Sequence, residues 1–235
     1  MRKQHIAAFL FPSILSFLNL VNGFFAPVAS CTSRNRPSTI MSATHSKGEF
    51  ELQEVKAQLN AMVKQGIRPK MLNNEKRNEL ESYLQAVLRS RPSPIPLKTL
   101  ADNGASALQG NWTLVFSSEN EGLGDLPRDA TVEIVILPNF KCEYKILFSK
   151  TLGMKSLTAK SSYIVDSSPV NPGLVTIIYQ DIVVDAFGIK LPVGAFGMLK
   201  GRATYIDTQW FDGMLWIDRS YSSDGNQFYN VYVKS

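Results

Sequence analysis

Histidine and cysteine are almost absent from this chain of 235 residues, which has two of each. Both histidines, His5 and His45, and one cysteine, Cys31, precede residue 48, so the rest of the chain has no histidine and a single cysteine, Cys142. A histidine-based catalytic triad and a histidine-ligated zinc site both need histidine, and an intrachain disulfide needs two cysteines. We therefore expect none of these three features beyond residue 47.

The sequence also has no uninterrupted hydrophobic run of membrane-spanning length. The longest candidate, residues 6–21, is interrupted by Pro12 and Asn19 and is shorter than the roughly 20 apolar residues that a spanning helix needs. It follows two basic residues, as the apolar part of a cleavable signal peptide does. We predict a signal peptide at residues 1–23, with a membrane anchor as the alternative.

The basic charge of the chain is confined to its N-terminal part. The whole chain has 25 Lys and Arg against 20 Asp and Glu, a net charge of +5. Residues 1–41 contain four of the basic residues and no acidic residue, which leaves 25 − 4 = 21 basic against 20 acidic. We therefore expect no nucleic-acid partner, because such binding depends on basic surface.

The segment after the signal peptide has the composition of a targeting sequence. Residues 24–47 are rich in Ser and Thr and have basic but no acidic residues, as transit peptides do. The junction VNGFFAP, residues 21–27, resembles the ASAFAP motif of algae with secondary plastids, such as diatoms. We predict a plastid transit peptide at residues 24–47 and a location in the stroma, at thylakoids or at plastoglobules. A secreted protein with a loose N-terminus is the alternative.

Two amphipathic helices are predicted in an N-terminal helical segment at residues 48–96. Apolar residues recur at helical spacing in residues 49–65 and again in about 74–89, which places them on one face of each helix. Asn73 is the expected N-cap of the second helix. Residues 91–110 contain three prolines, which cannot continue a helix, so we expect this stretch to run extended.

From Gly110 onward the apolar residues alternate with a period of two, as in strands. About eight short runs have this pattern: residues 112–117, 131–136, 143–148, 156–165, 174–184, 202–207, 213–219 and 227–233. No helical pattern separates them, so we predict a mainly β protein with an antiparallel barrel at residues 108–234, closed so that no edge is exposed. A barrel of about eight strands has room for one small ligand.

The first residues of the predicted barrel, Gly110-Asn111-Trp112, resemble the G-x-W motif that opens lipocalin barrels. In lipocalin-like barrels a basic residue of the last strands packs across this Trp by a cation–π contact. The resemblance makes Arg219 the candidate that closes the barrel over Trp112. An exposed arginine at a strand end is the alternative.

A longer resemblance, over about residues 50–233, is to the plastid lipid-associated proteins, the PAP/fibrillin family. It is carried by QGIRPKMLNNEKR in residues 64–77, by residues 84–96, by LQGNWTLVFSS at 108–118, and by the block at 210–228. Trp216 stands where the family usually has Arg, and Ser220 where it has Gly, whereas Arg219 matches. The resemblance implies a lipocalin-like barrel that binds a carotenoid, quinone or other plastid lipid and associates with thylakoids or plastoglobules.

We therefore expect a non-catalytic protein that binds a hydrophobic small molecule, with no cofactor and no transmembrane segment in the mature chain. Alternate side chains of a barrel point inward, so aromatic residues among them are the candidates for lining a cavity. Core packing is the alternative for each of them. The candidates are Trp112, Phe116, Tyr144, Phe148, Tyr179 and Trp216.

Residues 184–199, VDAFGIKLPVGAFGML, are apolar, rich in glycine and nearly uncharged. As a loop at the barrel mouth, this segment would gate the cavity or contact a membrane surface through Phe187, Leu191 and Phe196, because exposed apolar patches mark interaction sites. The alternative is a strand followed by a buried hairpin.

Two other functions stay open. A lipocalin-like pigment isomerase or lyase would depend on carboxylates, tyrosines or Cys142, and Asp181 and Asp185 are spaced to share one face of a strand. Two solvent-facing side chains are the simpler interpretation of that pair. An assembly factor for a photosynthetic complex would bind a protein in place of a lipid.

Overall fold

The computed structural model describes most of the chain from His45 onward. The described residues are 45–65, 67, 69–90, 92–118, 126–128, 130–149, 153–192, 201, 203–221 and 227–235. The signal peptide predicted at residues 1–23 lies outside them, as does the predicted transit peptide except for its last three residues, which already belong to the first helix. Both targeting segments stay predictions.

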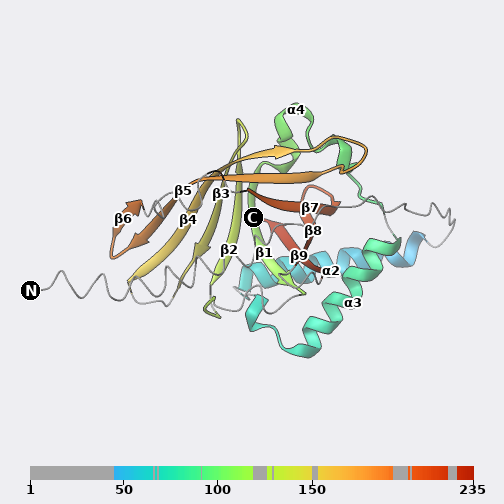
Figure 1. Cartoon of the computed structure of the whole chain (residues 1–235). Helices are drawn as coiled ribbons and strands as arrows, with labels where there is room; N and C mark the ends of the chain where they lie inside the picture. Colours follow the sequence, from blue (N-terminus) through green and yellow to red (C-terminus); the bar gives the residue numbers. More distant parts are fainter. Residues whose placement is uncertain are drawn as a thin grey trace, which may run out of the picture.

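Nine antiparallel strands form one sheet, and eight of them close into a ring (Figure 1). The strands are β1 (Gly110–Ser117), β2 (Thr131–Leu137), β3 (Lys141–Leu147), β4 (Met154–Val165), β5 (Leu174–Ala186), β6 (Ile189–Pro192), β7 (Ala203–Phe211), β8 (Leu215–Tyr221) and β9 (Gln227–Lys234). Each strand of the ring pairs with the next along the chain, and β9 pairs with β1. This arrangement confirms the predicted antiparallel barrel of about eight strands.

Strand β6 is not a member of the ring. It pairs with the last part of β5, whereas β7 pairs with the first part of β5 and so continues the ring. Of residues 184–199, predicted as a loop at the barrel mouth, the described part contains the end of β5 and the short strand β6. The described part therefore includes a β5–β6 hairpin that extends the sheet beyond the ring.

Two helices precede the sheet and cover part of its outer wall (Figure 1). They are α2 (His45–Gln65) and α3 (Asn74–Ser90), joined through the short helix η1 (Pro69–Met71). The predicted N-cap is confirmed, because the backbone N–H of Lys76 donates to Asn73 Oδ1 at 2.8 Å. Within the described chain, no helix is both long and apolar enough to cross a membrane.

The apolar stripes of α2 and α3 pack on the outer wall of β1, β7, β8 and β9. The buried residues of this contact are Leu52, Leu59, Met62, Leu80, Leu84, Val87, Val115, Phe116, Trp210, Leu215, Ile217, Val231 and Val233. Buried Arg77 ties α3 to the barrel, since Nη1 donates to the carbonyl of Ser117 at 2.7 Å and Nη2 donates to that of Pro69 at 3.1 Å. Burial on both sides leaves this part of the sheet without a solvent face.

The connection predicted to run extended across residues 91–110 instead contains three short helical turns. It contains η2 (Leu97–Thr99), α4 (Asp102–Ala105) and η3 (Ser106–Leu108). Prolines exclude a long regular helix but not single turns that begin after them. Leu100, Ala105 and Leu108 have no exposed surface and join the core inside the ring, so these turns cover one end of the barrel, the closed end.

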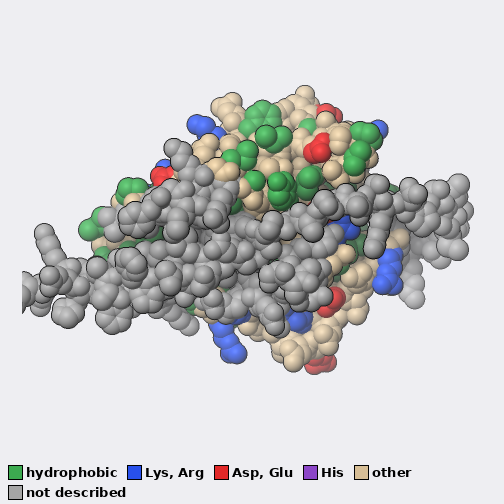
Figure 2. All heavy atoms as spheres, viewed as in Figure 1, with side chains coloured by type: hydrophobic (Ala, Val, Ile, Leu, Met, Phe, Trp, Pro, Cys, Tyr) green, Lys and Arg blue, Asp and Glu red, His purple; other side chains and the backbone are tan. Residues whose placement is uncertain are grey.

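Apolar side chains also lie on the outer wall away from α2 and α3. Ile164 of β4 and Tyr205 of β7 flank Thr176 of β5 in register and are about half exposed. Figure 2 shows hydrophobic side chains gathered over the upper part of the molecule, where Figure 1 places α4 and the β4–β5 connection. We call Ile164 and Tyr205 the outer apolar row.

Candidate functional site

An aromatic cluster fills the ring at its closed end. Trp112 and Trp216 have no exposed surface, and their ring centroids lie 5.4 Å apart. Phe211 packs on Trp112 at 5.4 Å and Tyr232 packs on Trp216 at 5.7 Å. Trp112 Nε1 donates to the carbonyl of Leu108 at 2.7 Å, which links the cluster to the covering turns. The two tryptophans among the cavity candidates are therefore core residues at this end of the barrel.

The cation–π contact expected at Trp112 is made by a different residue. Lys234 Nζ lies 5.3 Å from the centroid of the Trp112 ring, and the two residues are paired in register on β9 and β1. Arg219 lies on the outer wall, because strand β8 alternates and Trp216 occupies the inner face. This corrects the predicted barrel-closing role of Arg219.

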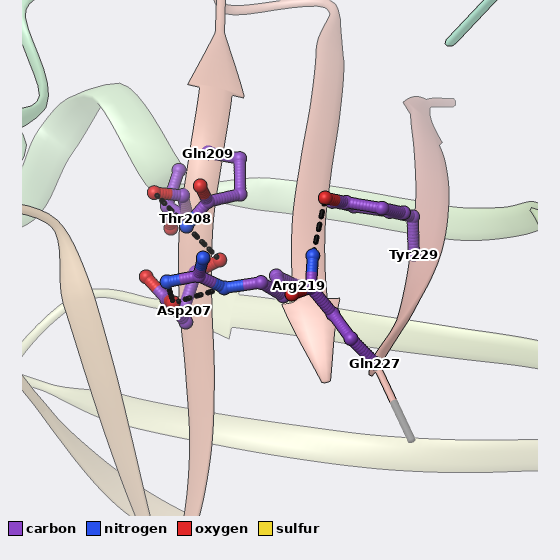
Figure 3. Close-up of polar contacts among 6 residues, drawn as sticks. All are labelled: Asp207, Thr208, Gln209, Arg219, Gln227 and Tyr229. Carbon is purple, nitrogen blue, oxygen red and sulfur yellow. Dashed lines mark hydrogen bonds and ion pairs between the residues drawn. The ribbon is translucent and has the colours of Figure 1, made fainter. Parts of the chain in front are cut away.

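Arg219 instead belongs to a polar group on the outer wall (Figure 3). Its guanidinium reaches from β8 to the carboxylate of Asp207 on β7. Gln209 donates to the carbonyls of Asp207 and Thr208, and Gln227 donates to Tyr229. The pair of Arg219 and Asp207 links β8 to β7 on the outer wall.

Phe116 also lies outside the ring, which corrects its assignment to the cavity. A bulge between Leu114 and Phe116 shifts the register of β1 against β9, and a bulge changes the face to which later residues point. Phe116 therefore packs against the helices, beside a cavity of about 20 Å³ between helices and barrel. That volume suits about one water molecule, not a pigment or lipid.

Three other cavity candidates do lie inside the ring. Tyr179 is buried, whereas Tyr144 and Phe148 pack against the interior core and keep part of their surface exposed. Tyr144 and Tyr179 lie within β3 and β5, close enough to Tyr232 of the aromatic cluster to raise its pKa, whereas Phe148 follows β3 at the end of the barrel opposite that cluster. We call that end, where Met154 pairs with Ala186, the mouth.

A buried carboxyl group that was not among the predicted site residues lies inside the ring. Asp218 is 1% exposed and faces inward, two residues after Trp216 on β8. Its Oδ1 accepts hydrogen bonds from Asn230 Nδ2 at 2.9 Å and from the backbone N–H of Asn230 at 3.2 Å. No Lys or Arg of the described residues forms an ion pair with it. Burial raises the pKa of Asp218 to about 7, although the Asn230 hydrogen bonds oppose this effect.

Two tyrosines lie near this carboxyl group, and a third lies near those two. Burial raises the pKa of Tyr144 and of Tyr232, and the nearby Asp218 raises both further. Burial also raises the pKa of Tyr179, and Tyr144 adds to the effect. The alternation of β8 indicates that Asp218 shares a face with Trp216, but not that this face is the inner one. We call Asp218, Asn230 and the three tyrosines the interior polar cluster.

The predicted membrane-contact segment is described only in part. Phe187 and Gly188 form the turn of the β5–β6 hairpin, and both have positive φ, 54° and 76°. Positive φ is unfavourable for a bulky residue, yet Phe187 is 58% exposed and its ring lies against Gly153. Ile189, the next residue of the hairpin, is 59% exposed. The side chain of Leu191 and all of Phe196 lie outside the described residues.

The groups considered for catalysis do not meet in one place. Asp181 and Asp185 lie on the outer wall, because the alternate residues Ile182 and Val184 join the interior core. Cys142 is buried inside the ring, and burial raises the pKa of its thiol to about 12, with a further contribution from Glu143. A thiol with this pKa is not a nucleophile near neutral pH. The described residues include no cluster suited to hold a metal ion.

The comparisons with known proteins do not decide between these possibilities. No family model matches this chain, and no curated protein matches it.

Proposed function

We propose that this chain is a non-catalytic plastid protein that binds a hydrophobic small molecule in its barrel and associates with thylakoids or plastoglobules. The bound molecule would be a carotenoid, a quinone or another plastid lipid. The observation that carries this proposal is a closed ring with an apolar interior and one buried polar cluster. Ligand sites combine mostly apolar walls with a few placed polar groups in this way.

The chemistry of the interior favours binding over a covalent mechanism. The Cys142 thiol is held in its protonated form, and the pair of Asp181 and Asp185 faces away from the interior. One observation favours the second candidate, a pigment isomerase or lyase. Asp218 has a pKa of about 7, which is the range in which a general acid or base is most effective.

A ligand-retention experiment tests the proposal. Protein comprising residues 45–235, which contain every described helix and strand, is mixed with a total pigment and lipid extract of plastids, repurified and extracted. We expect one class of apolar molecule to be retained in about equal molar amount and unchanged in structure. Retention of none would contradict a binding function, and conversion of the retained molecule by the natural protein but not by Asp218→Asn would favour the isomerase.

Membrane association is tested at the β5–β6 hairpin. Phe187→Asp is expected to reduce flotation with plastid-lipid vesicles severalfold, because it puts a charge in place of an exposed aromatic ring. Asp is well suited to the first central position of a two-residue hairpin turn with positive φ, so the fold should be retained. Flotation of the natural protein and the variant, with circular dichroism of each, is the measurement.

The matched control is Tyr205→Asp in the outer apolar row, another exposed aromatic residue on a different strand. It should float as the natural protein does. If Tyr205→Asp lost flotation and Phe187→Asp kept it, the membrane contact would lie on the outer apolar row and not at the hairpin.

A further inference from the structure

The interior polar cluster contains a hydrogen-bond acceptor without a donor. Asn230 is 1% exposed, and its Nδ2 donates to Asp218 Oδ1 at 2.9 Å and to Ser220 Oγ at 3.4 Å. Its own Oδ1 is buried and has no hydrogen-bond partner among the described residues. Buried polar atoms are rarely left unpaired, and each exception calls for an explanation.

The same cluster contains a carboxyl group without a cation. The nearest basic residue in sequence, Arg219, points to the outer wall, where it pairs with Asp207. A buried charge without a partner is unfavourable, so Asp218 destabilises the fold unless a further hydrogen-bond donor pairs with it. Asp218 and Asn230 together present acceptors that a hydrogen-bond donor inside the barrel would satisfy.

Two inward-facing residues beside this cluster are partly exposed. Tyr144 on β3 and Ser220 on β8 face inward from opposite sides of the ring, and both are partly exposed. The wall between them includes small residues, Ala159 and Ser161 on β4 and Thr204 on β7. Small inward side chains fill less of the interior than the aromatic residues of the closed end, and a barrel of about eight strands is wide enough for one small ligand.

We propose that Asp218 and Asn230 bind the hydroxyl end group of an otherwise apolar ligand. This inference rests on the proposed function, and it narrows the ligand class to apolar molecules that carry a hydroxyl end group. A hydroxyl group donates to Asn230 Oδ1 or to the Asp218 carboxyl and still accepts from a tyrosine, whereas a carbonyl only accepts. The site therefore prefers a hydroquinone to the quinone of the same ring and chain. A site built to pair with a hydroxyl discriminates strongly against an analogue that lacks it.

Equilibrium dialysis under anaerobic conditions tests the preference. The probes are a decyl-substituted benzoquinone and its hydroquinone, which have the same carbon skeleton and differ in donors. At pH 8, where the Asp218 carboxyl is ionised and can only accept hydrogen bonds, we expect the natural protein to bind the hydroquinone about tenfold or more tightly than the quinone. Asp218→Asn should reduce the ratio to about threefold or less, because the amide that replaces the carboxyl donates to the quinone carbonyl.

The matched control is Asp181→Asn, the same chemical change on the outer wall, and it should keep the natural ratio. Equal affinity of the natural protein for both probes overturns the inference and leaves the proposed function standing. A preference that survives Asp218→Asn overturns the assignment to this cluster. If the protein binds neither probe but retains a different apolar molecule from the plastid extract, the inference is also overturned. If it binds neither probe and retains no apolar molecule, the proposed function is overturned as well. The comparison of the two probes needs only the natural protein, so it does not depend on the folding of a variant.

Discussion

Asp218→Asn is expected to stabilise the folded protein at about pH 8. The natural protein should lose stability as pH rises from about 4 to about 7, and the variant should lack most of this loss. The Asp218 carboxyl has a pKa of about 7 in the folded protein, against 3.8 as its ordinary value. Between these values the folded state holds a proton that the unfolded state has released. The free energy of unfolding therefore falls as pH rises through this window, and it levels off above it.

The size of this effect follows from the difference between the two pKa values. Each pKa unit corresponds to about 1.4 kcal/mol, so the loss across the window is on the order of 4 kcal/mol. Of the groups close to Asp218, Asn230 and the tyrosines do not change charge in this range because the tyrosine pKa values are raised. The charge of Asp207, which pairs with Arg219, also raises the pKa of Asp218, and the substitution leaves Asp207 in place. The change in stability of the variant is therefore attributable to one carboxyl group.

Urea unfolding at several pH values between about 4 and 8 measures this effect. The difference between Asp218→Asn and the natural protein should be smallest at the acid end and grow toward pH 8. Asp181→Asn, on the outer wall, should follow the natural protein throughout. A difference that is constant across the whole range would contradict a raised pKa of Asp218.

Trp112→Ala is expected to cost about 3–5 kcal/mol of unfolding free energy, which is a typical loss for a buried aromatic residue replaced by Ala. Trp112 has no exposed surface, packs on Phe211 and Trp216, and donates its ring N–H to Leu108. The variant therefore loses contacts to two strands and to the turns that cover the closed end. Domains of this size are stable by roughly 5–15 kcal/mol, so the variant should unfold at much lower urea concentration.

The control for Trp112→Ala separates packing from the cation–π contact. Lys234→Met keeps an unbranched side chain over the Trp112 ring and removes the charge. We expect it to cost about 0.5–1 kcal/mol, the usual size of such a contact at a partly exposed position. Equal effects of the two variants on urea unfolding would mean that the charge of Lys234 contributes as much stability as the whole Trp112 ring. That result would contradict the prediction that ring packing contributes more than the cation–π contact.

Features with a local physical cause could be predicted from the sequence. The N-cap at Asn73 was predicted correctly because a cap depends on residues within one turn of the helix. The strands after Gly110 were predicted nearly in full because alternation with a period of two is also local. The helical turns after Pro96 were not predicted, since they are too short to produce a periodic pattern and depend on contacts of Leu100 and Leu108 with the barrel.

The candidate site could be predicted only in part, because the direction of a side chain on these strands is not local. Helices α2 and α3 cover the outer wall at β8, so Leu215 and Ile217 outside are as apolar as Trp216 inside. An alternating pattern cannot show which face is inner when both faces are buried. For this reason Asp218 was overlooked, although it lies in phase with Trp216.

The sequence by itself determined the class of the fold, since strand periodicity, turn residues and two amphipathic stripes lead to helices followed by an antiparallel barrel. Only the tertiary structure decided what the barrel presents to a ligand. The bulge in β1 turns Phe116 outward, the register of β9 places Lys234 rather than Arg219 over Trp112, and closure of the ring buries Asp218 without a cation. Each of these depends on how strands distant in sequence pair, and a shift of one residue exchanges the inner and outer faces of a strand.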